Sequence, residues 1–108
     1  MTFFRYLYYG TSLDERRGRL SREIKAGRLP KDVYVIALPE EETHLVSIHP
    51  GKELQKGYQK KSGLFVIGLA GSLEEAQDLS GSIIAMIYKK TGAFGIRQYF
   101  EPFMKETL

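Results

Sequence analysis

The chain has 108 residues, of which 43% are hydrophobic and 12% aromatic, with 16 Lys and Arg against 13 Asp and Glu. This length and composition predict one globular domain with an apolar core and argue against a disordered chain. The absence of cysteine excludes disulfides and thiolate metal sites, and the net charge of +3 says less about partners than its distribution would.

The first ten residues, MTFFRYLYYG, do not form a typical signal peptide. They are apolar but short, contain Arg5 and lack a small-residue cleavage pattern. No apolar run approaches the roughly 18 to 20 residues that a membrane span needs. We therefore expect a cytoplasmic protein with no membrane partner.

The N-terminal third predicts a strand, a helix and a second strand, over residues 3–9, 13–26 and 33–38. Aromatic and β-branched residues are frequent in both strand segments. The helix follows the stretch GTSLDE, in which Ser12 and Glu15 have the spacing of a capping box. Glycine or proline follows each element, as is typical of helix and strand ends.

The C-terminal part repeats this order, with a strand at 64–70, a helix at 73–90, a fourth strand at 94–100 and a tail at 101–108. Its helix follows the stretch GSLEE, in which Ser72 and Glu75 repeat the capping-box spacing. The segment 40–62 between the two parts is an irregular connection, where a short strand at 44–49 and a short helix at 52–61 are both compatible with the residues.

The chain thus reads as one domain, 1–108, built from two βαβ units at about 3–38 and 64–100. This order predicts an α+β fold, the ferredoxin-like βαββαβ sandwich, in which an antiparallel four-stranded sheet carries both helices on one face. The alternative is a three-layer α/β fold, in which the middle segment supplies a crossover helix between parallel strands.

The two glycine-containing stretches allow a chemical and an architectural interpretation. Each turn would present helix N-terminal amides to an anion, but neither stretch completes a Walker or dinucleotide motif. Acidic residues open both predicted helices and would repel a phosphate. They are Asp14, Glu15, Glu74 and Glu75. We therefore interpret both stretches as helix caps.

The segments 33–38 and 64–70 do not alternate apolar and polar residues, so both faces of these strands should be covered. Two helices cover only one face of a ferredoxin-like sheet. The segment 40–62, an apolar ligand or a second copy of the chain would cover the second face of the sheet. The alternative is that residues at the strand edges are partly exposed to solvent, so that the pattern overstates burial. We expect a homodimer formed through the sheet, because symmetric dimers need no further component.

Arg5 and Arg97 interrupt otherwise apolar strand segments. In the ferredoxin-like order the first and last strands are neighbours, so the two guanidinium groups would lie close enough to bind a carboxylate or phosphate. Tyr99 would stack beside them, and these three residues are the candidate ligand-binding residues. The structural alternative is that both arginines extend to the sheet edge or pair with acidic residues.

RNA recognition motifs share this strand–helix order. The stretch LYYG at 7–10 resembles their first-strand signature, and KSGLFVIG at 61–68 resembles their third-strand signature. The resemblance implies RNA binding on the sheet, but Gly63 and Gly68 stand where stacking aromatics belong and only Phe65 is in place. Weak RNA or nucleic-acid binding is therefore the alternative function rather than the favoured one.

Catalytic patterns are missing from the sequence. His44 and His49, near Glu40–Glu42, do not have the spacing of a known metal site, and no Gly-x-Ser-x-Gly stretch is present. We predict no catalytic residue, no metal and no cofactor. The sequence favours a small, non-catalytic binding or regulatory module that self-associates, and it leaves a small-molecule ligand open.

Overall fold

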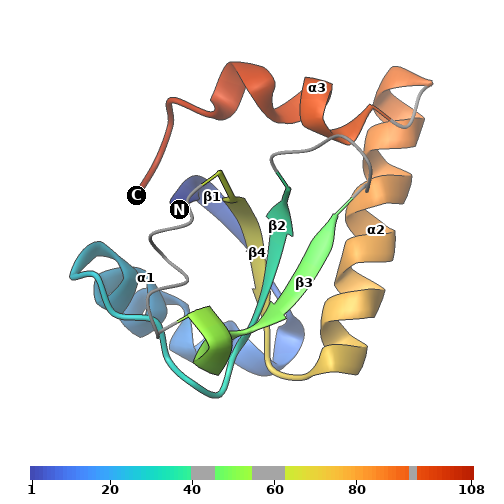
Figure 1. Ribbon diagram of the computed structural model, residues 1–108. Helices are drawn as coiled ribbons and strands as arrows, with labels where there is room; N and C mark the ends of the chain where they lie inside the picture. Colours follow the sequence, from blue (N-terminus) through green and yellow to red (C-terminus); the bar gives the residue numbers. More distant parts are fainter. Residues whose placement is uncertain (40–45, 55–62, 93–94) are drawn as a thin grey trace.

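The computed structural model describes residues 1–39, 46–54, 63–92 and 95–108 (Figure 1). The strands are β1 (Thr2–Tyr9), β2 (Tyr34–Leu38), β3 (Ser47–Pro50) and β4 (Phe65–Ala70). The α-helices are α1 (Arg17–Lys25), α2 (Leu73–Thr91) and α3 (Ile96–Phe100). Short 3₁₀ helices are η1 (Thr11–Arg16), η2 (Gly51–Leu54) and η4 (Glu101–Phe103).

The four strands form one mixed sheet in the order β1-β4-β2-β3. β2 is antiparallel to both of its neighbours, whereas β1 and β4 are parallel, with Phe3 opposite Val66 and Tyr9 opposite Leu69. A ferredoxin-like sheet is antiparallel throughout. The ferredoxin-like prediction is therefore wrong, and the fold is α+β with a mixed four-stranded sheet.

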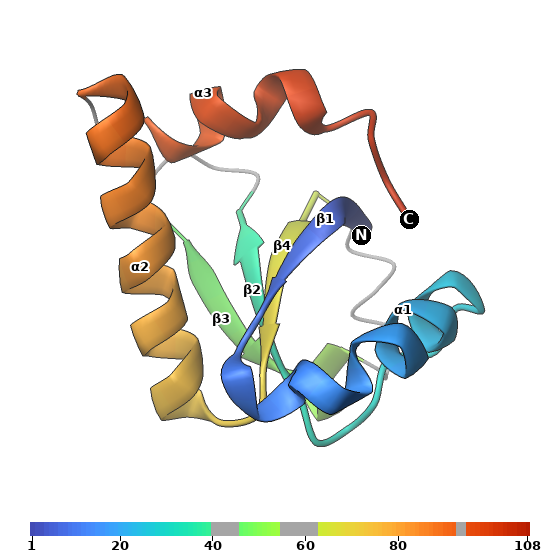
Figure 2. The ribbon, with the colours of Figure 1, turned by 180° about the vertical axis from the view of Figure 1, so that it is seen from behind.

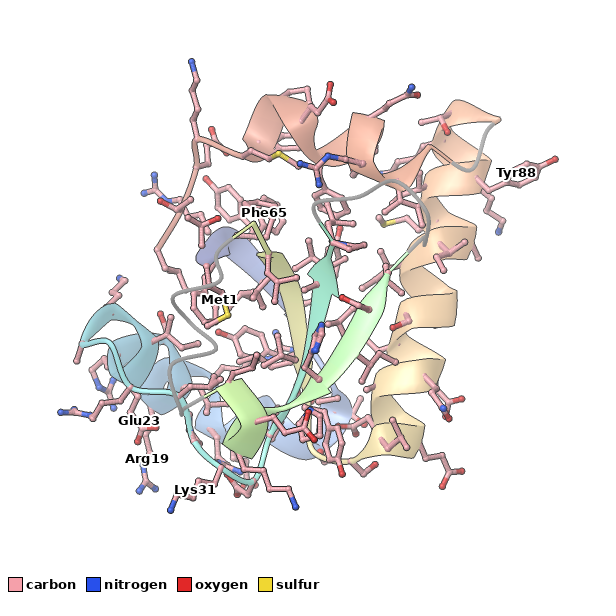
Figure 3. The ribbon with its side chains drawn as sticks, viewed as in Figure 1. Met1, Arg19, Glu23, Lys31, Phe65 and Tyr88 are labelled. Atoms are coloured by element: carbon pink, nitrogen blue, oxygen red, sulfur yellow. The ribbon has the colours of Figure 1, made fainter. Side chains whose placement is uncertain are left out.

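The predicted fourth strand at 94–100 is also wrong, because residues 96–100 form helix α3. Ile96 and Phe100, four positions apart, are both buried. The Phe100 ring packs edge-on against Phe4 of β1, at 5.4 Å between centroids, and lies 6.3 Å from Phe65 of β4. Helix α3 thus covers the end of the sheet at which β1 and β4 begin (Figures 1 and 3).

The prediction that both faces of the central strands are covered is confirmed. All six residues of β4 are buried, and so are Val35 to Leu38 of β2. Helices α1 and α2 lie on opposite sides of the sheet (Figures 1 and 2). Each contributes buried side chains, Leu20 and Ile24 from α1 and Ile83 and Ile87 from α2. The cover comes from within one chain, because the two helices do not share a face.

The long helix was predicted almost to the residue. Ser72 is the N-cap of α2, and its Oγ accepts a hydrogen bond from the Glu75 N–H at 3.1 Å. Gly92, at a φ of 72°, ends the helix in the left-handed conformation that glycine favours. The predicted helix at 13–26 instead begins as η1, whose N-cap is Gly10 with no side-chain cap, so the first capping box is wrong.

The C-terminal tail pairs with the outer edge of β1. The Arg5 N–H donates to the Glu106 carbonyl at 2.8 Å, and the Leu108 N–H donates to the Phe3 carbonyl at 3.0 Å. Of the irregular connection, only 46–54 is described, and it forms β3 and η2. Most of the helix considered for 52–61 lies outside the described residues. None of the helices in the described ranges has the length and apolar character needed to cross a membrane.

Candidate functional site

The three candidate ligand-binding residues do not form the predicted group. Arg97 and Tyr99 lie on helix α3 rather than on a strand beside Arg5. Arg5 is exposed, and its guanidinium lies 5.8 Å from the centre of the Tyr6 ring. The described residues show no hydrogen bond, ion pair or ring contact that joins Arg5 to Arg97 or Tyr99.

Arg97 and Tyr99 make structural contacts instead. Arg97 Nη1 donates a hydrogen bond to the Pro39 carbonyl at 2.8 Å, which ties α3 to the end of β2. The Tyr99 ring packs edge-on against Phe100 and lies 5.9 Å from Phe103. Their assignment as ligand-binding residues stays a prediction, but the geometry that motivated it is absent.

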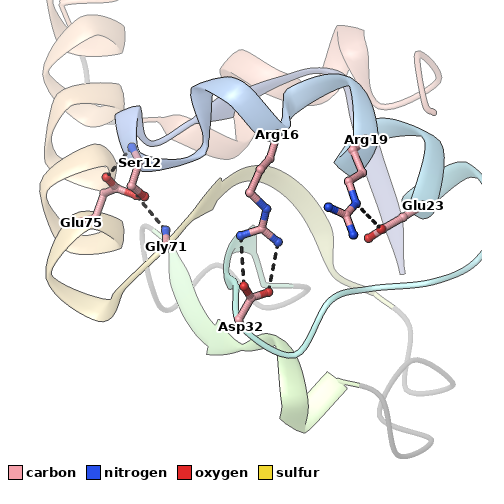
Figure 4. A network of polar contacts seen from close by, with 7 residues as sticks. All are labelled: Ser12, Arg16, Arg19, Glu23, Asp32, Gly71 and Glu75. Carbon is pink, nitrogen blue, oxygen red and sulfur yellow. Dashed lines mark hydrogen bonds and ion pairs between the residues drawn. The ribbon is translucent and has the colours of Figure 1, made fainter.

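The two similar glycine-containing stretches meet in space (Figure 4). The Glu75 carboxylate of α2 accepts hydrogen bonds from the Gly71 N–H at 2.7 Å and from the Ser12 hydroxyl and N–H at 2.6 and 3.1 Å. A Cβ on Gly10 would overlap that carboxylate, and one on Gly71 would overlap the Ser12 hydroxyl. Because both overlaps are with the ends of side chains, an alanine at either position would have to push Glu75 or Ser12 out of their shared hydrogen bond.

Glu75 occupies the position that an anion would take between the two turns. The Gly71 N–H and then the Ser12 hydroxyl, hydrogen-bonded to its carboxylate, hold the pKa of Glu75 below its usual 4.5. A phosphate would have to displace a charged group that is part of the chain. The interpretation of these stretches as anion sites therefore has no support, although Ser12 acts as a donor to Glu75 and not as a cap.

A cleft lies beside this cluster, at the ends of β1 and β4. These neighbouring strands are parallel, and the segments that follow them leave toward opposite sides of the sheet (Figures 1 and 2). Such a switch point opens a crevice outside the carboxyl ends of the strands. The cleft has a volume of about 370 Å³, and its lining includes Tyr9, Thr11, Glu74, Asp78 and Ser82.

The cleft is acidic and carries an aromatic wall. Glu74 and Asp78 are exposed and make no ion pair within the described ranges, while Glu75 is already bonded to Ser12. Burial raises the pKa of Tyr9, and the neighbouring Arg17 guanidinium, 5.2 Å from the ring centre, opposes this rise. The arrangement is suited to a small cation rather than an anion.

The arginines of η1 and α1 are largely occupied by carboxylates. Arg16 makes a two-pronged ion pair with Asp32 at 3.0 and 3.2 Å (Figure 4). Two further pairs are Arg17–Asp14 at 2.7 Å and Arg19–Glu23 at 3.4 Å. These contacts make this face charge-balanced rather than uniformly basic, and they weaken the argument for nucleic-acid binding.

No metal-binding cluster of three or more His, Asp or Glu is present among residues 1–39, 46–54, 63–92 and 95–108. His44 lies outside these ranges, so the pair that it would form with His49 is not tested. His49 Nε2 lies 2.8 Å from the Ser47 hydroxyl, and burial lowers the pKa of its imidazole. These histidine contacts give no catalytic assignment.

Comparison of the chain with protein-family models, curated proteins and solved structures found no match in any of the three. The function must therefore be argued from the site itself.

Sequence reasoning missed Tyr9, Glu74 and Asp78 as a group. Tyr9 ends the first predicted strand, and Glu74 and Asp78 lie in the helix that follows the strand at 64–70, but most of the chain separates Tyr9 from Glu74. The sequence feature that could have predicted this group is the repeated glycine-containing turn. It predicts a shared cleft only if the strands before the two turns are parallel neighbours.

Proposed function

We propose that this domain is a binding module whose ligand is a small molecule with an amine or guanidinium group, held in the cleft at the ends of β1 and β4. The observation that supports it is the position of the cleft, at the point where two parallel neighbours send their following segments to opposite sides of the sheet. Open α/β sheets use such crevices for ligands.

The lining supports a cation as the bound group. Glu74 and Asp78 lie one turn apart on α2, a spacing that puts two carboxylates on one face of the helix. The Tyr9 ring also lines the cleft, and its contact with the Arg17 guanidinium shows that a cation packs against this ring. The hydroxyl groups of Thr11 and Ser82 would accept hydrogen bonds from N–H groups.

This proposal keeps the binding module expected from the sequence and changes its surface. The homodimer stays a prediction. The uncovered sheet face that led us to expect it is absent, because the chain covers both faces of its own sheet. Weak RNA binding has lost a stacking platform, since Phe65 is 4% exposed. The cytoplasmic, non-catalytic and cofactor-free assignments stay predictions that no observation tests.

The test is a titration of ¹⁵N-labelled protein with agmatine, a guanidinium amine without a carboxylate. A ligand of about nine non-hydrogen atoms in an open cleft should bind with a dissociation constant on the order of 1 mM. We expect amide shifts confined to Tyr9–Thr11 and to Ser72–Ser82. Shifts that spread over the surface, or none at ten times that concentration, would refute the proposal.

Two comparisons sharpen the result. Asp78→Asn should weaken agmatine binding about fivefold or more, whereas Glu101→Gln, an exposed carboxylate on η4, should leave it unchanged. Succinate should not bind, since the cleft repels anions. An equal loss of agmatine affinity in Asp78→Asn and Glu101→Gln would show that agmatine binds through the overall charge of the protein and not in this cleft.

A further inference from the structure

A second cleft, of about 250 Å³, lies where the start of β1, the end of α1 and the C-terminal segment meet. It is separate from the acidic cleft and shares no residue with it. Its apolar lining residues are Met1, Phe3, Ile24, Leu29 and Leu108.

Three segments far apart in the sequence build this cleft. The α1 helix ends at Lys25, and Gly27, at a φ of 80°, turns the chain so that Leu29 packs inward with 5% exposure. The third wall is the C-terminal segment, which is held by the Leu108 N–H bond to the Phe3 carbonyl and by the bridge between Phe4 and Thr107.

Arg28 provides the one charged side chain in this lining. It is exposed and makes no ion pair with another described residue, whereas Arg16, Arg17 and Arg19 are all paired. Its backbone N–H is bonded to the Glu23 carbonyl at 2.8 Å, which fixes the base of the side chain at the helix end. Thr2 and Thr107 make the lining partly polar. A hollow that combines apolar side chains with an unpaired guanidinium complements a hydrocarbon tail that ends in a carboxylate.

We propose that this cleft binds a short-chain fatty acid of the size of octanoate, with the tail against Phe3, Ile24 and Leu29 and the carboxylate on Arg28. The volume is below the roughly 300–1,000 Å³ of sites for drug-sized molecules, so the tail is short. Guanidinium and carboxylate groups match in a two-pronged geometry, which gives the site its selectivity for an acid over an alcohol.

The experiment measures the affinity of the whole chain for butanoate, hexanoate and octanoate by calorimetry and by amide shifts. Each methylene that becomes fully buried should strengthen binding about fourfold, and the open side of the cleft reduces this to roughly two- to threefold. The shifts should appear in residues 1–3, 24–29 and 107–108. Equal affinity across the series would overturn the proposal.

Matched variants separate the two parts of the ligand. Arg28→Gln should weaken octanoate binding about tenfold and leave octanol binding unchanged. Arg22→Gln, an exposed arginine on α1 outside the lining, should change neither. Thr107→Phe, at an exposed position in the lining, should block both ligands. Equal effects of the two arginine variants would refute the assignment of the carboxylate to Arg28, and circular dichroism confirms that each variant is folded.

Discussion

Replacing Glu75 tests whether the contact between the two glycine turns stabilises the fold. Its carboxylate accepts three hydrogen bonds, one from Gly71 and two from Ser12. A hydrogen bond to a charged group contributes roughly 1.5–3 kcal/mol in a buried site, and solvent competition at this half-buried position reduces each to roughly 0.5–1 kcal/mol. Glu75→Ala should therefore lower the free energy of unfolding by about 2 kcal/mol.

Glu75→Gln should lower the free energy of unfolding by about 1 kcal/mol. The amide oxygen can still accept from the Gly71 N–H and the Ser12 hydroxyl, but the amide nitrogen cannot accept a hydrogen bond from the Ser12 N–H. Urea unfolding followed by circular dichroism measures both, and a loss of 1 kcal/mol also lowers the melting temperature by about 4–8 °C. Glu74→Gln is the matched control, since it removes a charge from the same helix turn without removing a hydrogen bond of the described residues. If the Glu74 and Glu75 variants lose the same stability, the effect is the helix dipole and the reasoning fails.

Three further predictions concern the pKa of Glu75, two glycines and the packing of α3. Because the pKa of Glu75 is lowered in the folded protein, its stabilising contribution is present above pH 4.5 and is lost as the pH falls through the folded pKa. In urea unfolding measured at a series of pH values below 4.5, wild type should therefore lose more stability than Glu75→Gln. Gly71→Ala should destabilise the protein by about 1 kcal/mol, because the Ser12 hydroxyl must turn away from the added Cβ and lose its hydrogen bond to Glu75. Gly81→Ala, in α2 with open space around it, should raise the melting temperature. A stabilising Gly71→Ala or a destabilising Gly81→Ala would contradict this packing. Phe100→Ala should cost about 3–5 kcal/mol, as its buried ring joins α3 to the sheet, and a loss below 1 kcal/mol in thermal unfolding would show that α3 is not docked there.

Local signals predicted individual elements well. The helix over 73–90 carries an N-cap serine, acidic residues in its first turn, two lysines in its last turn and a glycine after it, and the structure has α2 at Leu73–Thr91. The strand over 64–70 has no polar side chain, and β4 is buried along its whole length. These features depend on residues within one turn or one strand, so the chain alone specifies them.

The segment at 94–100 shows where local signals become ambiguous. Ile96 and Phe100 are spaced by four, which is compatible both with the period of two in a strand and with one face of a helix. A strand there would need a partner edge, and the edge of β1 is already paired with residues 106–108. The choice of helix therefore depends on packing against Phe4 and Phe65, which no local pattern displays.

The amino-acid sequence by itself determined that two strands are apolar on both faces and that a glycine-containing turn precedes each of the two longer predicted helices. Only the tertiary structure decided that β1 and β4 are parallel neighbours, that α1 and α2 take opposite sides, and that Ser12 meets Glu75 across 63 positions. The physical reason is that the hydrophobic effect has no direction: an apolar strand is equally well buried by a helix, a strand or a second chain that keeps water away from it. Strand order and helix placement are fixed by the contacts of the whole chain, and both proposed clefts exist only because of that arrangement.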